Sequence, residues 1–170
     1  GRDVFGGGGI MPDINLGVSS KFDLIKILKK NNFVFNFALA YHERNPIKNL
    51  KDFSLKESVF NQFKKDCLSK DFSLETTTEN LLLKAYVAAE EENLSSIIKS
   101  VAVFNDALNK EKEEEFVLLK SEILTILSEE IIKMAFYNEG VYEYALLNNK
   151  AINTAKILLD DLERYAALLK

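Results

Sequence analysis

Residues 114–138 read EEFVLLKSEILTILSEEIIKMAFYN, and this stretch decides the fold class of the 170-residue chain. Its apolar side chains recur every three or four positions over about seven turns, as on one face of an α-helix. That face consists of Phe116, Leu119, Ile123, Leu127, Ile131 and Met134, with Asn138 at its end. Because so long a stripe must be buried, we predict a core helix from about Glu114 to Asn138, ended by Gly140 in the left-handed conformation.

Similar helical patterns flank this stretch on both sides. Apolar residues at helical spacing occur at Leu82, Tyr86 and Ala89, at Leu94, Ile97, Val101, Phe104 and Leu108, and at Ile152, Ala155, Leu159, Leu162 and Leu169. The run from Lys110 to Glu115 is typical of a charged connection or of a solvated first turn. The pattern predicts five to seven helices with short connections, hence a mainly α fold, an antiparallel helical bundle or array.

Serine residues mark several expected helix starts. Ser19 or Ser20 suits an N-cap before the first helix. The tetrapeptide Asp-Phe-Ser-Leu occurs at residues 52–55 and again at 71–74. Ser54 with Glu57 forms a capping-box pattern, in which two side chains satisfy free backbone amides, so each copy predicts a helix start.

The N-terminus differs from the rest, because residues 1–13 read GRDVFGGGGIMPD. Gly6, Gly7, Gly8 and Gly9 accept positive φ, and with Pro12 and Asp13 they indicate a tight connection between two short extended pieces. We therefore expect a short glycine-rich β appendage at the N-terminus. Strands need partners, and the remaining sequence offers none, so residues 1–16 should depend on strands elsewhere or pair with a neighbouring chain.

Residues 1–13 resemble the segment that closes the catalytic domain of the C-terminal processing, or tail-specific, serine proteases, G-R-x-V-Y-G-G-G-G-I-x-P-D. This chain has Phe5 where tyrosine is usual. Residues 122–155 resemble the helical tail of Bacteroidetes-type members through Glu130, Ile131, Tyr137, Gly140, Leu147 and Ile152. The resemblance implies that residues 1–18 end the protease-domain β region and that residues 19–170 form a helical C-terminal domain.

In that family a serine attacks the peptide bond and a lysine accepts its proton. Both residues lie upstream of the glycine run, so the resemblance implies that no catalytic residue falls in this chain. It also implies a parent endopeptidase that cleaves proteins near their C-termini, in the periplasm or cell envelope. The expected partners are proteins: the parent's own protease and PDZ domains, a second copy, or an adaptor.

Residues 33–41 alternate apolar and other side chains with period two, which alone favours a strand. The same segment resembles a Phe-Ala-Leu-x-Tyr helix of the protease family. Glu43 and Arg44 before Pro46 suit a helix end. We therefore predict a helix over residues 33–44.

The sequence contains no complete motif for phosphate binding, for a serine–lysine enzyme of the penicillin-binding type or for a metal site. Gly6 to Gly9 lack the lysine and hydroxyl residue of a phosphate-binding loop, and Ser96 with Lys99 lacks the further motifs of penicillin-binding enzymes. His42 is the one histidine, so His42-Glu43 cannot complete a zinc-protease motif, and Glu113 to Glu115 lack the histidines of a di-iron bundle. We expect no metal, no cofactor and an inert Cys67.

Composition limits the remaining classes. The net charge of −4 argues against a nucleic-acid-binding surface. The sequence contains no run of about 18 apolar residues, so we predict no membrane span. The charge is uneven, at +5 over residues 1–70 and −9 over residues 71–170. Basic residues near Lys26 suit either an acidic partner or plain solvation. The alternative to a protease tail is an independent helical adaptor without a protease parent.

Overall fold

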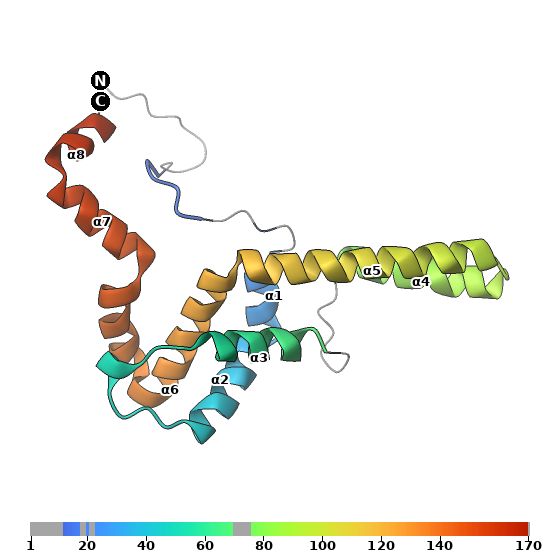
Figure 1. Cartoon of the computed structure of the whole chain (residues 1–170), viewed down its shortest axis with the longest axis horizontal. Coiled ribbons are helices and arrows are strands. Elements are labelled where there is room, and N and C mark those ends of the chain that lie inside the picture. The colour runs from blue at the N-terminus through green and yellow to red at the C-terminus, as the bar shows by residue number, and fades with distance from the viewer. Residues whose placement is uncertain (1–11, 18–19, 21–22, 70–75, 170) are drawn as a thin grey trace.

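A computed structural model describes residues 12–17, 20, 23–69 and 76–169 (Figure 1). These residues form eight α-helices, one short 3-10 helix and no strand. The predicted mainly α fold is confirmed. Gly6 to Gly9 lie outside the described residues, and Pro12 and Asp13 are exposed in a segment without regular structure. The β appendage and the boundary at residue 18 therefore stay predictions.

The helices follow one another with short connections. Their bounds are α1 Leu24–Lys30, α2 Phe33–Arg44, η1 Leu50–Asp52, α3 Glu57–Cys67, α4 Thr77–Glu91, α5 Ser95–Leu118, α6 Lys120–Asn148, α7 Lys150–Asp160 and α8 Leu162–Leu168. The helix over residues 33–44 is confirmed. Its Phe33, Val34 and Ala38 are buried, at the spacing of a helix face, and α2 packs against α6.

The core gathers around the start of α6. Ile123, Leu127 and Ile131 are fully buried there, together with Phe116 from the end of α5. Helices α1, α2 and α3 supply the opposing side chains, among them Leu28, Phe60 and Phe63. The sequence-predicted stripe is therefore the centre of the core as far as Ile131.

The predicted helix over residues 114–138 is divided between two helices. The chain bends at Leu119, which ends α5 with φ −95° and ψ 15°. The predicted charged connection at Lys110 to Glu115 is wrong, because this run continues α5 and buries Lys112 and Glu115. Two long helices thus meet at the core, one on each side of Leu119.

The sequence predicted that Gly140 ends the core helix, and this prediction is wrong. The turn falls at Tyr137, whose φ of 57° and ψ of −159° interrupt α6. Residues 120–136 and 138–148 then lie side by side, since Ser121, Thr125, Tyr144 and Asn148 line one pocket. Gly140 is buried at this crossing, where an added Cβ would overlap Phe136 Cβ and lie 3.2 Å from Ile132 Cγ2. Close approach, rather than positive φ, requires the glycine.

The start of α3 lacks the predicted capping box. α3 begins at Glu57 with Lys56 at the N-cap and no side-chain cap, so the Ser54 and Glu57 capping box does not form. Ser20 Oγ does accept from the Leu24 amide at 3.2 Å, although Asp23 is the N-cap residue of α1. Ser19 and residues 71–74 lie outside the described residues.

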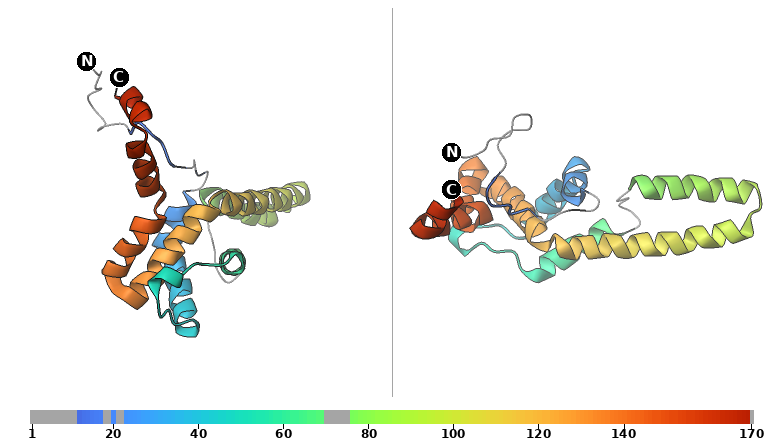
Figure 2. Two further views of the ribbon diagram at one scale, coloured as in Figure 1. Left: turned by 60° about the vertical axis from the view of Figure 1, so that its left-hand side comes forward. Right: turned by 90° about the horizontal axis from the view of Figure 1, so that it is seen from above.

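Three parts are visible in the overall shape. Helices α1, α2 and α3 surround the first half of α6, while α4 and α5 project together as a long arm (Figure 1, Figure 2). α7 and α8 extend from the other end of α6. The sequence predicted one last helix here, but the chain breaks at Asp161, whose carboxylate accepts from the Arg164 amide at 3.0 Å.

Candidate protein-binding surfaces

The arm is an antiparallel pair of helices, joined at its outer end by residues 92–94 (Figure 2). One stripe of buried or half-buried residues on each helix faces the other helix, at alternating spacings of three and four. This seam consists of Glu79, Leu82, Tyr86 and Ala89 on α4 and Ile98, Val101, Asn105, Leu108 and Lys112 on α5. Its spacing is that of a coiled coil, which explains why the two helices run straight beside each other.

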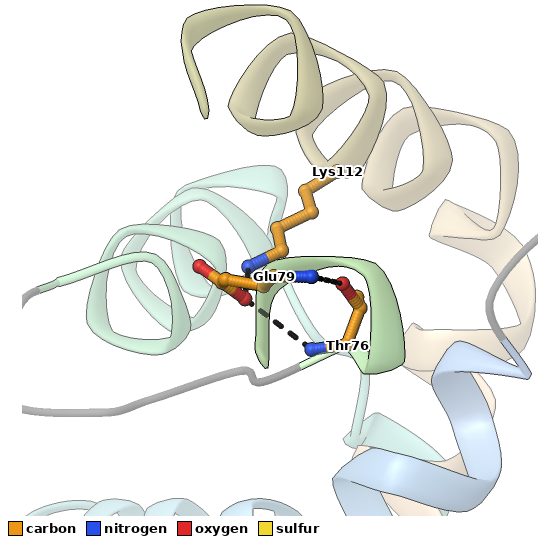
Figure 3. A network of polar contacts seen from close by, with 3 residues as sticks. All are labelled: Thr76, Glu79 and Lys112. Carbon is orange, nitrogen blue, oxygen red and sulfur yellow. Dashed lines mark hydrogen bonds and ion pairs between the residues drawn. The ribbon is translucent and has the colours of Figure 1, made fainter. Parts of the chain in front are cut away.

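A polar network closes the inner end of the arm (Figure 3). Thr76 caps α4 by accepting from the Glu79 amide at 3.1 Å, and Glu79 accepts from the Thr76 amide at 3.3 Å. The same Glu79 carboxylate forms an ion pair with Lys112 of α5. Because the Lys112 side chain is only 5% exposed, its ammonium depends on this partner. One carboxylate therefore fixes both the start of α4 and its position against α5.

The outer surface of the arm is rich in apolar side chains. Leu81 and Leu83 on α4 are each 60% exposed, and Phe104 and Val103 on α5 are 59% and 68% exposed. Val87 and Ile97 are exposed as well. Single exposed apolar residues are normal, but a group of them on a projecting element is typical of an interaction surface. Residues 137–169 expose a similar group of large apolar side chains.

A second apolar surface lies between α2 and α3. It is a half-open pocket of about 440 Å³, lined mainly by Phe33, Phe37, Tyr41, Val59 and Phe63, with Asn36, Arg44, Gln62 and Asp66 among its polar residues. Phe37 and Phe63 meet edge to face with ring centroids 5.1 Å apart. The size and lining suit an apolar side chain or ligand.

Cys67 lines the same pocket but has no nucleophilic character. The side chain is buried, and this burial, with a smaller contribution from the Asp66 carboxylate, raises the pKa of the Cys67 thiol to about 12. A reactive cysteine needs the opposite shift. Cys67 is therefore a packing residue at neutral pH.

The other candidate groups do not assemble into a catalytic site. Ser96 and Lys99 are both exposed at the start of α5, and Ser96 uses its carbonyl to accept from the Ser100 hydroxyl. Among the described residues, no group of three or more His, Cys, Asp and Glu could hold a metal ion.

Tyr86 on α4 donates to Glu90 at 2.7 Å, and this hydrogen bond raises the pKa of the Tyr86 phenol.

Glu57 on α3 accepts from Lys120 at the start of α6, and this contact lowers the pKa of the Glu57 carboxyl.

None of the described helices has the length and apolarity that a membrane crossing requires.

Comparison with known proteins agrees with this arrangement. Residues 24–159 match the family model of a probable PDZ-protease, C-terminal helical domain. The chain belongs to this family. The match spans all of α1 to α6 and most of α7, so the whole core and the arm of this PDZ-protease helical domain fall within it. Neither a curated protein nor a solved structure matches the chain.

The match of residues 24–159 to this family model favours a protease tail over an independent adaptor. The sequence did contain a local signal for the polar network of the arm. The Thr76-to-Glu79 spacing is a capping-box pattern in its own right, and Lys112 continues the stripe of Val101 and Leu108. A charged residue on an apolar stripe, four positions after a seam leucine, was the available signal for a buried ion pair.

Proposed function

We propose that this helical domain is a non-catalytic part of a C-terminal processing serine endopeptidase and acts through protein contacts. The observation that carries the proposal is the exposed apolar surface of the α4–α5 arm, which neither packs internally nor carries catalytic groups. Membership of the PDZ-protease family supplies the proteolytic context. The serine and lysine that perform the reaction would lie upstream of Gly6.

Three roles fit such a domain: assembly of the protease, control of substrate access, and docking of an adaptor. The arm favours assembly, because its apolar residues project away from the body of the domain (Figure 1). We further propose that the parent protein acts in the periplasm or cell envelope. This follows from the resemblance of Gly1 to Asp13 to the end of the tail-specific protease domain.

Two preparations test the proposal. The isolated chain should not hydrolyse an unfolded protein substrate, and a Ser96→Ala variant should be indistinguishable from it. The parent protease should be compared with a variant that lacks residues 24–159, on both an unfolded protein and a short chromogenic peptide. Deletion should impair proteolysis of the protein while sparing the peptide. Turnover by the isolated chain, or unaltered proteolysis after deletion, would contradict the proposed function.

A further inference from the structure

One face of the arm carries a patterned apolar strip. Leu81, Ala85 and Ala88 each precede a seam residue of α4 by one position, and Ile97 and Phe104 do the same on α5. At about 100° per residue, in an antiparallel pair, positions that precede the seam lie on the same face of both helices. All five residues are exposed. We call this surface the strip face. Leu83 follows the seam residue Leu82 and lies on the opposite face.

Side-chain size changes along the strip face. Toward the body it presents Leu81 and Phe104, with Thr78, Ala107 and Glu111 beyond them. Toward the tip it presents the smaller Ala88, Ser100 and Ile97, with Ala85 midway on α4. A second arm laid antiparallel on this face would set Leu81 against Ala88 of the other copy and Phe104 against Ile97. Large residues would then meet smaller ones, as interdigitated helix packing requires. A parallel two-fold pair would instead set α4 against α5 of the other copy, so that the two larger residues, Leu81 and Phe104, would meet each other.

Charge supports the same orientation. The arm, residues 76–118, carries nine Asp and Glu against four Lys and Arg, and three of the acids are Glu90, Glu91 and Glu92 at the tip. Residues 23–69, which hold α1 to α3, carry nine Lys and Arg against five Asp and Glu. An antiparallel pair brings each acidic tip toward the basic body of the other copy. A parallel pair would place the two acidic tips together, which is unfavourable.

The shape of the domain provides room for such a partner. The chain exposes 12313 Å², whereas a compact monomer of 19.3 kDa would expose about 8500 Å². The arm is free of the body over most of its length in both views (Figure 2). Its strip face is therefore accessible to a second copy without rearrangement of the core.

We propose that two copies of this domain associate through their arms, antiparallel and related by a two-fold axis near Ala85, to form a four-helix bundle. This inference rests on the proposed function and specifies its assembly role. The pair is isologous, so each copy offers the same face and the association closes at two. The acidic tips contact the basic bodies, which makes the association sensitive to salt.

Light scattering and sedimentation of the chain over a wide concentration range test the proposal. We expect a monomer–dimer equilibrium that Leu81→Glu weakens by at least about tenfold, or about 1.4 kcal/mol. Leu83→Glu is the matched control, because it makes the same change at equal exposure on the opposite face. It should leave the dimer intact. Circular dichroism must show that both variants keep their helix content.

Cross-linking tests the orientation. Ala85→Cys should form a disulfide-linked dimer, because residue 85 lies near its own symmetry mate. Ala88→Cys alone should not, but a mixture of Ala88→Cys and Leu81→Cys chains should cross-link to each other. A monomer at every concentration, equal effects of Leu81→Glu and Leu83→Glu, or self-linking of Ala88→Cys would overturn the proposal. None of these results would alter the outcome of deleting residues 24–159 from the parent, which tests the proposed function separately.

Discussion

Lys112 of α5 and Glu79 of α4 form an ion pair at the point where the arm leaves the body (Figure 3). Thirty-three positions separate them in the chain. The Glu79 carboxylate also accepts from the Thr76 amide, so the ion pair and the helix cap share one group. Loss of either partner should therefore loosen the first turn of α4 as well as the contact between the helices.

Replacing Lys112 tests this coupling. Lys112→Met removes the buried ammonium and leaves Glu79 without its partner, so we expect a loss of about 1–3 kcal/mol in the free energy of unfolding. Urea denaturation followed by circular dichroism measures it. Lys110→Met, two positions earlier and exposed, is the control and should change stability by less than about 0.5 kcal/mol. Equal effects of the two substitutions would show that the ion pair contributes nothing.

The core stripe makes a second prediction. Ile123 and Ile131 are fully buried, so Ile123→Ala or Ile131→Ala should each lower the free energy of unfolding by about 2–5 kcal/mol. Val103→Ala removes apolar atoms from an exposed site and should cost little. Denaturant titration distinguishes the two classes. Small losses at both isoleucines would mean that the start of α6 is not the core.

The turn within α6 predicts opposite effects at two nearby positions. Gly140→Ala should destabilise by about 1–3 kcal/mol, because the new methyl group meets Phe136 and Ile132. Tyr137→Gly should instead stabilise by about 1 kcal/mol, since φ of 57° with ψ of −159° is a conformation that glycine adopts without strain. The Tyr137 side chain is 75% exposed, so its removal sacrifices little packing. Thermal melts of both variants measure these effects, and a destabilised Tyr137→Gly protein would contradict the turn at residue 137.

The buried thiol predicts a pH dependence at high pH. Folding raises the pKa of Cys67 from 9.0 to about 12, so the folded state holds its proton where the unfolded state releases it. The stability from this group is fully present below pH 9.0 and is lost as the pH rises toward 12, at about 1.4 kcal/mol per pH unit. Cys67→Ala should lack this component. Parallel pH profiles of the two proteins would contradict the assignment.

Cys67 should also be protected from reagents. A thiol-specific dye should react with the native chain at pH 8 far more slowly than with the urea-unfolded chain, because the thiol is buried and neutral. Rapid native labelling would mean that the pocket between α2 and α3 opens in solution.

Sequence alone determined the elements whose signal is local. The period of Phe116, Ile123, Leu127 and Ile131 sufficed to predict a central buried helix, because burial of one face imposes that spacing directly. The glycine run and the pattern around Glu130 pointed to the protease family, and residues 24–159 match the helical domain of that family. The helix at residues 33–44 was predicted by resemblance and against its period-two pattern, which on its own favours a strand.

Only the tertiary structure decided where the long helices break and what their charged residues do. Lys112 and Glu115 look solvated in sequence because a run of charges usually is, but the antiparallel return of α4 places Glu79 beside Lys112. The turn at Tyr137 falls one residue before the helix end predicted from Gly140, but it has no glycine or proline at the turn itself, and contact between the two halves of α6 over Gly140 accompanies it. Both features depend on residues far apart or on steric fit between helices. Local propensity contains no information about either, because the energy that selects them arises only when the helices pack.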